Sequence, residues 1–93
     1  MEPIRFQGRI RYWDPAKSSG LAVVDIPAPR VAALGGLKQQ RVQGTLGDAA
    51  FSSSVMPAGG GHLALSVSKA MLTAAGLSVG EGAVVSITKV GRD

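Results

Sequence analysis

The sequence predicts a mainly β fold: a six-stranded barrel built from two β-β-α-β repeats, with two short helices. Three observations predict it. Residues 24–37 and 65–77 carry the same pattern at a constant offset of 41 residues. Short alternating or continuous apolar runs recur between turns rich in glycine and proline, as they do in all-β domains. Six short strands would leave unpaired edges unless the sheet closes, and closure into a barrel removes those edges.

The first half of the chain supplies three strands and one helix. Residues 4–12 alternate strictly between apolar and polar, which predicts a half-buried strand that ends before a turn over residues 17–20. Residues 21–26 are nearly all apolar, which predicts a strand covered on both faces. Two prolines then suit the first turn of a short helix over residues 30–34, and a Gly-Gly pair ends it. Residues 40–46 alternate again and predict the third strand.

The second half repeats this plan. We expect a strand over residues 50–56, a flexible glycine-rich turn over residues 57–61, and a strand over residues 62–67. The serine that follows is a good N-cap for a helix over residues 69–75, which the next glycine ends. A final strand covers residues 83–89. The two short helices are expected to plug or flank the openings of the barrel.

The composition indicates one soluble domain. The 93 residues form a single domain, 1–93, with an internal repeat of about 4–47 and 49–90. A hydrophobic share of 45% with 17% charged residues is typical of a folded globule. No apolar run reaches the ~18 residues of a membrane span, and cysteine is absent. A bacterial, cytoplasmic protein without disulfides or membrane contact is therefore expected.

The strongest functional candidate is a row of arginines on the polar face of the first strand. The row consists of Arg5, Arg9 and Arg11. Alternate residues of a strand lie ~6.5 Å apart on one face, which is similar to the spacing of neighbouring phosphates along a nucleic-acid strand. The net charge of +4 is compatible with such a partner. The alternative is an edge strand whose charges prevent aggregation.

Other side chains extend this candidate. We expect Arg41 and Lys89 to point outward and to enlarge the basic patch. Tyr12 and Trp13 flank the row, where an aromatic ring is placed to stack on a base.

The remaining polar residues do not predict catalysis. His62 follows three glycines, which would let its backbone approach a ligand closely. The favoured interpretation is an ordinary half-exposed histidine at the start of a strand. The acids Asp14, Asp25, Asp48 and Glu81 each stand alone in a turn or at a strand end. No spacing suits a metal site or a catalytic carboxylate pair, so we expect no enzyme activity, cofactor or metal.

Several residues after position 40 match a family pattern. They are Val42, Gly44, Phe51, Ser54, Met56, Pro57, Lys69, Gly76, Leu77, Gly80 and Glu81. With this pattern the chain resembles the bacterial domain-of-unknown-function family nineteen-oh-five, loosely from Phe6 to near the C-terminus. The resemblance implies an AbrB-like double-split β-barrel in which one chain supplies both halves, and therefore a monomer. It implies no biochemical activity.

The sequence leaves three functional hypotheses open. The first is a non-enzymatic binding or interaction module that uses its outer face or a cleft at a barrel end, with another protein or nucleic acid as partner. The second is nucleic-acid binding through the arginine row. The third is a small-molecule site near His62, Trp13 and the glycine-rich turn.

Overall fold

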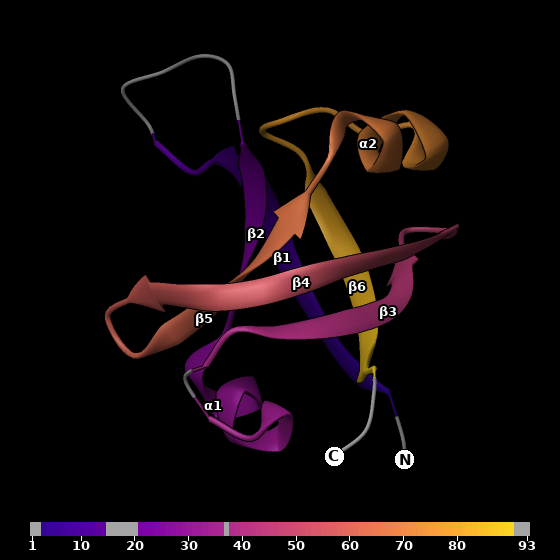
Figure 1. Cartoon of the computed structure of the whole chain (residues 1–93). Helices are drawn as coiled ribbons and strands as arrows, with labels where there is room; N and C mark the ends of the chain where they lie inside the picture. The colour runs from indigo at the N-terminus through magenta and orange to yellow at the C-terminus, as the bar shows by residue number, and fades with distance from the viewer. Residues whose placement is uncertain (1–2, 15–20, 37, 91–93) are drawn as a thin grey trace.

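Six antiparallel strands close into a barrel in the order β1-β2-β5-β4-β3-β6 (Figure 1). The computed structural model describes residues 3–14, 21–36 and 38–90, so the turn expected at residues 17–20 lies outside it. The strands are β1 (Ile4–Tyr12), β2 (Ala22–Ile26), β3 (Gln40–Leu46), β4 (Ala49–Gly59), β5 (His62–Val67) and β6 (Gly82–Lys89). The predicted mainly β, six-stranded barrel with two helices is confirmed.

The two helical segments lie at different ends of the barrel (Figure 1). The first consists of α1 (Ala28–Val31) and a 3₁₀ helix, η1 (Ala32–Leu34), and it buries Val31 and Leu34 in the core. The second, α2 (Lys69–Ala75), has no buried residue and flanks the core instead. α1 with η1 therefore closes one opening, as expected from the sequence. Within the described ranges no helix is long and apolar enough to cross a membrane.

α2 begins and ends where the sequence predicts, whereas α1 begins at Ala28, two residues before the predicted start, and η1 ends at Leu34 as predicted. The Ser68 hydroxyl accepts the Met71 backbone N–H at 3.1 Å, which caps the first turn of α2. Gly76 ends α2 with φ 68°, and Gly35 ends η1 with φ 92°. Glycine adopts this left-handed conformation without the steric cost that a Cβ imposes.

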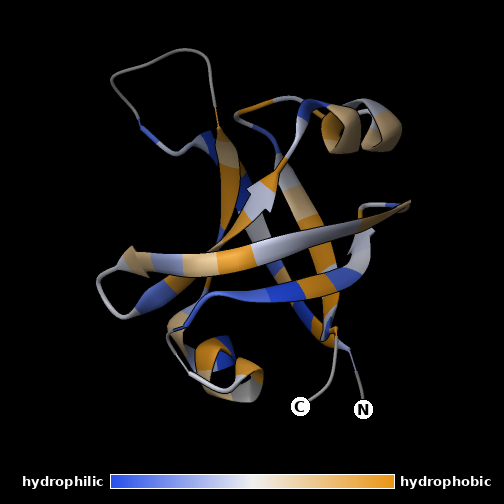
Figure 2. Ribbon diagram, viewed as in Figure 1, coloured by the Kyte–Doolittle hydropathy of each residue, from blue (hydrophilic) through white to orange (hydrophobic). Residues whose placement is uncertain are grey.

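The interior of the barrel is apolar throughout. Figure 2 shows hydrophobic residues distributed along the strands and in α1. Among the described residues, no polar or charged side chain is buried. The largest fully buried side chains are Ile10, Ile26, Leu34, Leu46, Leu63, Leu65 and Ile87. Burial of apolar surface in this core stabilises the barrel. Because side chains fill the interior, a ligand would bind to the outside of the barrel.

The hairpin between β4 and β5 departs from the prediction. Residues 57–61 were expected to form a flexible turn, but β4 continues through Pro57 to Gly59, with an irregular register between those two residues. Three consecutive glycines do adopt positive φ angles there, with values of 84°, 63° and 82°. The strand extends further because a bulge accommodates a proline that cannot donate to the ladder.

A smaller difference is at β2, which begins one residue later than expected and leaves Leu21 42% exposed.

The first strand contacts two different neighbours along its length. Residues 4–9 of β1 pair with β6, and residues 10–12 pair with β2. Residues 4–9, which carry Arg5 and Arg9, therefore pair with a neighbour on one side only, so the alternative of a charged strand edge that prevents aggregation stays a prediction. The change of neighbour occurs near Gly8, where an added Cβ would lie 2.7 Å from the Val24 side chain.

The register brings equivalent positions of the two halves together. Val24 pairs with Leu65, and Thr45 pairs with Ser86. Both pairs join residues at the offset of 41 on which the repeat was predicted. Superposition of the halves by a pseudo-two-fold axis stays a prediction.

Candidate functional site

The outer side of β1 carries the predicted arginine row, but its members differ in their surroundings. Arg5 and Arg9 are exposed and lie on the part of β1 that pairs with β6. Arg11 is half-buried and lies on the part that pairs with β2. The outward direction of all three follows from the burial of Ile4, Phe6 and Ile10 at the alternate positions.

Arg11 is bound to an acid on the neighbouring strand. Its Nε donates to Asp25 Oδ2 at 2.6 Å, and its Nη2 donates to Asp25 Oδ1 at 2.8 Å. A third contact, from Nη1 to the Tyr12 carbonyl oxygen at 3.1 Å, fixes the plane of the guanidinium. A bidentate geometry of this kind combines charge with directional hydrogen bonds. The expectation that Asp25 stands alone is therefore wrong.

His62 completes this network from a third strand. Its Nε2 lies 3.0 Å from Asp25 Oδ1. Asp25 pairs in register with Ala64, so His62 reaches it diagonally, and Arg11 does the same from β1 because its direct partner is Val23. The predicted half-exposed position of His62 at the start of a strand is confirmed.

The network has a clear electrostatic consequence. The hydrogen bonds from Arg11 lower the pKa of Asp25, against the opposing effect of burial, and His62 adds to the lowering. The same contact raises the pKa of Arg11. The negative charge of the Asp25 carboxylate is thus compensated by Arg11 within the protein. In the described part of the chain, no hydroxyl is hydrogen-bonded to the His62 ring, so the arrangement lacks the nucleophile of a catalytic triad.

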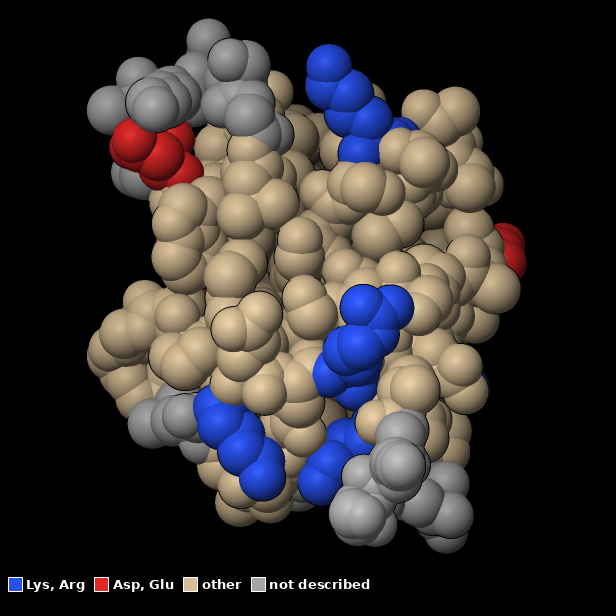
Figure 3. Space-filling view, in the orientation of Figure 1, with Lys and Arg blue, Asp and Glu red and all other residues tan. Residues whose placement is uncertain are grey.

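A second charged region surrounds α1. We name it the basic surface, and it consists of Arg5, Arg30, Lys38, Arg41 and Lys89. Figure 3 shows most of the blue side chains at the centre and over the lower part of this face, with another group at the top, whereas red ones appear only at its margins. In the described ranges, none of these five cations takes part in an ion pair.

Specific contacts hold the basic surface together. Arg30 Nε donates to the Arg5 carbonyl oxygen at 3.1 Å, which ties α1 to the start of β1. The Val90 backbone N–H donates to the Arg41 carbonyl oxygen at 3.0 Å, which ties the start of β3 to the end of β6. A Cβ built on Gly35 would lie 3.3 Å from Lys89 Nζ and 3.8 Å from Lys38 Cε, so both lysines pass over the end of η1.

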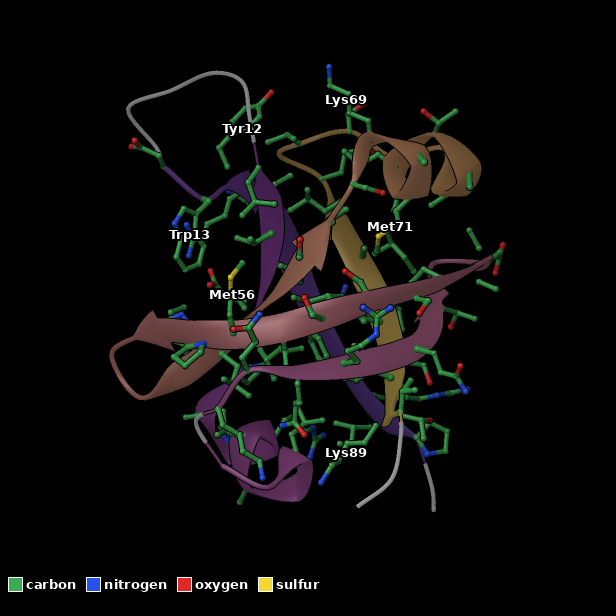
Figure 4. The ribbon with its side chains drawn as sticks, viewed as in Figure 1. Tyr12, Trp13, Met56, Lys69, Met71 and Lys89 are labelled. Carbon is green, nitrogen blue, oxygen red and sulfur yellow. The ribbon has the colours of Figure 1, made fainter. Side chains whose placement is uncertain are left out.

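Two predictions about this surface have different outcomes. Arg41 is exposed on the outside of β3, as predicted. The outward direction predicted for Lys89 is wrong, because Lys89 pairs with the buried Val42 and follows the inward positions of β6. Its ammonium group reaches the surface at the end of the barrel beside α1 (Figure 4). Arg30 and Lys38 were not singled out from the sequence, since helix and loop cations carry no periodic signal.

The aromatic residues lie away from the basic surface. Figure 4 shows Tyr12 and Trp13 at the far end of β1 from Lys89. Trp13 is 38% exposed, and its backbone N–H donates to the Leu21 carbonyl oxygen at 2.7 Å. It lies next to Arg11 and the Asp25 network, so it does not form one patch with Arg5 and Arg41.

Three surface hollows can be described. The largest, about 430 Å³, lies outside β6 between Arg5, Asp48 and Leu77. A second, about 420 Å³, separates Tyr12 from α2. A third, about 270 Å³, is lined by Pro3, Ile4, Arg5 and Arg30. None of the three includes His62 or Trp13. The described residues also contain no group of three or more metal-ligating acids, histidines or cysteines.

The fold and the charged regions define a small closed β-barrel domain with one ion-paired side and one basic end. Residues 6–87 match the family model described as "Domain of unknown function (DUF1905)", and the chain belongs to this family. The family resemblance expected from the sequence is confirmed. A search of curated proteins gives no match.

Proposed function

We propose that this protein is a non-enzymatic domain that binds nucleic acid through its basic surface. The observation that carries the proposal is the gathering of five cations at one barrel end without an ion pair in the described ranges. Like charges repel when they are brought together, and a polyanion relieves that repulsion while releasing its own counterions. The family resemblance implies a double-split barrel like that of AbrB-type DNA-binding domains, and this favours the same partner by fold-level analogy alone.

The proposal differs from binding by the arginine row alone. Arg11 is bound to Asp25, so its charge is already compensated. The contacts would come instead from β1, α1, β3 and β6, which meet at the α1 end (Figure 1). No aromatic residue belongs to the basic surface, so we propose contact with phosphates and no stacking of bases.

Matched pairs of variants test the position of the site. Arg30→Gln with Arg41→Gln removes two charges from the basic surface, and Arg9→Gln with Lys69→Gln removes two exposed charges elsewhere. Retention of generic duplex and single-stranded DNA would be measured at ~50 and ~200 mM salt. We expect the first pair to weaken duplex binding about tenfold and to lower the salt slope by about 2, since each phosphate contact contributes ~0.9.

Three results would contradict this proposal, and the first two come from the DNA-binding experiment. One is a lack of retention of either DNA by the unmodified protein at low salt. The other is an equal loss in both pairs of variants, which would indicate a response to net charge alone. Binding of an acidic protein in place of DNA would likewise reject the nucleic-acid assignment.

We propose further that the domain is a bacterial, cytoplasmic monomer. One chain supplies all six strands of the closed barrel, so the barrel needs no second copy to be complete. The lack of cysteine fits a reducing compartment, which is also where nucleic acid is found. Light scattering at micromolar concentration tests the oligomeric state, and a dimer would contradict it.

A further inference from the structure

The hollow between Arg5 and Arg30 is lined by two arginines that are distant in sequence. Arg5 lies at the start of β1, and Arg30 lies in α1. The bond from Arg30 Nε to the Arg5 carbonyl oxygen, 3.1 Å long, fixes the two segments against each other. Both residues line a hollow of about 270 Å³, and Pro3 and Ile4 form the rest of its lining.

The two guanidinium groups have hydrogen-bonding capacity to spare. Each arginine carries five N–H donors, and it remains protonated at any physiological pH. Within the part of the chain that the structure describes, only Arg30 Nε has an acceptor, and neither side chain has an ion pair. By contrast, Arg11 makes four hydrogen bonds, two to Asp25 and two to backbone carbonyl oxygens. The hollow therefore presents donors and positive charge without a matching acceptor.

The size and lining of the hollow restrict the ligand. Sites for drug-sized ligands occupy about 300–1,000 Å³, and this hollow of about 270 Å³ is smaller. No aromatic side chain lines it, so it offers no surface on which a base would stack. A tetrahedral oxyanion with several oxygens matches two planar guanidinium forks, which bind phosphate bidentately.

We infer that the hollow between Arg5 and Arg30 binds a phosphate monoester, and specifically the terminal phosphate of a nucleic-acid strand. Two permanent positive charges favour a dianion over the single charge of an internal phosphodiester. The second pKa of a phosphate monoester is about 6, so the group carries nearly two charges at pH 7. The inference rests on the proposed function for the identity of the strand, whereas the phosphate site itself does not depend on it.

The first experiment compares two DNA duplexes that differ in one group. Fluorescence anisotropy would measure the affinity for a blunt duplex with 5′-phosphates and for the same duplex with 5′-hydroxyls. We expect the phosphorylated duplex to bind about fivefold more tightly, as expected for one added charge-assisted contact. This preference should disappear in Arg30→Gln and persist in Arg9→Gln, a matched control on β1 outside the hollow.

The second experiment uses inorganic phosphate and NMR. We expect millimolar phosphate to shift the backbone amide signals of Ile4 and Arg5 and the Nε–Hε signal of Arg30, with weaker shifts at pH 5 than at pH 7.5. Arg30→Lys keeps the charge but loses the fork, and it should bind phosphate more weakly than the unmodified protein while keeping its amide spectrum. The amide spectrum of Arg30→Gln, recorded in the same way, controls for unfolding of that variant.

The outcomes separate the two proposals. Equal affinity for both duplexes, or a 5′-phosphate preference that survives Arg30→Gln, overturns the inference and leaves nucleic-acid binding standing. Phosphate shifts spread evenly over all cations also overturn it, because they would indicate general screening. Shifts confined to the hollow without retention of DNA would reject the proposed function and keep the phosphate site.

Discussion

Arg5 and Arg11 lie on the same strand, point to the same outer side of the barrel and carry the same charge, yet their surroundings differ. Arg11 faces β2, where Asp25 binds it through two hydrogen bonds. Arg5 faces β6, where its direct partner is Ser86, and it makes no ion pair within the described ranges. The strand period thus decides the face on which a side chain lies, and the neighbouring strand decides whether its charge is compensated.

The comparison predicts that an acid placed opposite Arg5 would convert the basic end into a copy of the paired end. Ser86→Asp sets a carboxylate directly across the ladder from Arg5. We expect at least about a tenfold loss of duplex DNA affinity at ~50 mM salt, through both pairing and repulsion of phosphate.

Ala70→Asp is the matched control for this change. Ala70 is exposed in the first turn of α2, where an acidic side chain is tolerated well. Ala70→Asp changes the net charge by the same amount as Ser86→Asp. Binding by Ser86→Asp that equals binding by Ala70→Asp would show that Arg5 is not a contact.

Removal of the acid from the paired end should act on stability. Asp25→Asn leaves Arg11 without its charged partner, so we expect the free energy of unfolding in urea to fall by about 1 kcal/mol. The figure is kept small because the Asp25 side chain is 39% exposed and solvent screens the pair. Duplex affinity should change less than twofold, because Arg11 lies away from the basic surface.

The same change made at Asp48 serves as the comparison. Asp48 is exposed in the turn between β3 and β4 and has no ion pair in the described ranges. Asp48→Asn should leave the unfolding free energy within ~0.5 kcal/mol of the unmodified protein. An equal loss at both positions would argue against a stabilising network.

The lowered pKa of Asp25 predicts how the paired end responds to acid. A carboxylate whose pKa is lower in the folded state stabilises the fold above its unfolded pKa, which is about 3.9 for aspartate. This contribution is lost as the pH falls through the folded pKa. We therefore expect the unmodified protein to lose more stability than Asp25→Asn between about pH 5 and pH 2, by less than ~1 kcal/mol.

Urea unfolding followed at several pH values measures this difference. Parallel stability curves for the two proteins over that range would contradict the network. Arg11→Gln should reproduce the flatter curve, because it removes the first cause of the lowered pKa.

The sequence was sufficient for the barrel because its signals are local and periodic. Alternation placed β3 at the observed bounds, and capping signals placed α2 between Ser68 and Gly76. The charged network could not be predicted in the same way. It joins Arg11, Asp25 and His62 across three strands by diagonal contacts, and diagonals depend on a register that no local pattern specifies.

The basic surface was only partly predictable for a related reason. Arg5 and Arg41 follow strand parity and were expected to be exposed. Arg30 joins them only because α1 folds back onto β1. Lys89 joins them at the end of a strand, where a long side chain leaves the interior and reaches solvent. Chain topology, and not residue spacing, assembles this surface.

The smallest predicted effect concerns His62, the outer member of the paired network. His62 makes one hydrogen bond to Asp25, whereas Arg11 makes two, and its side chain is 30% exposed. We expect His62→Ala to lower the free energy of unfolding by about 0.5 kcal/mol or less at pH 7. His62→Gln, whose amide can also donate to the carboxylate, should recover part of that loss.

A double-mutant cycle between His62→Ala and Asp25→Asn, measured in urea, isolates the coupling between the two side chains. Strictly additive losses would show that His62 lies beside the Arg11–Asp25 pair without strengthening it. A loss as large as that of Asp25→Asn would place His62, and not Arg11, as the principal partner of the acid.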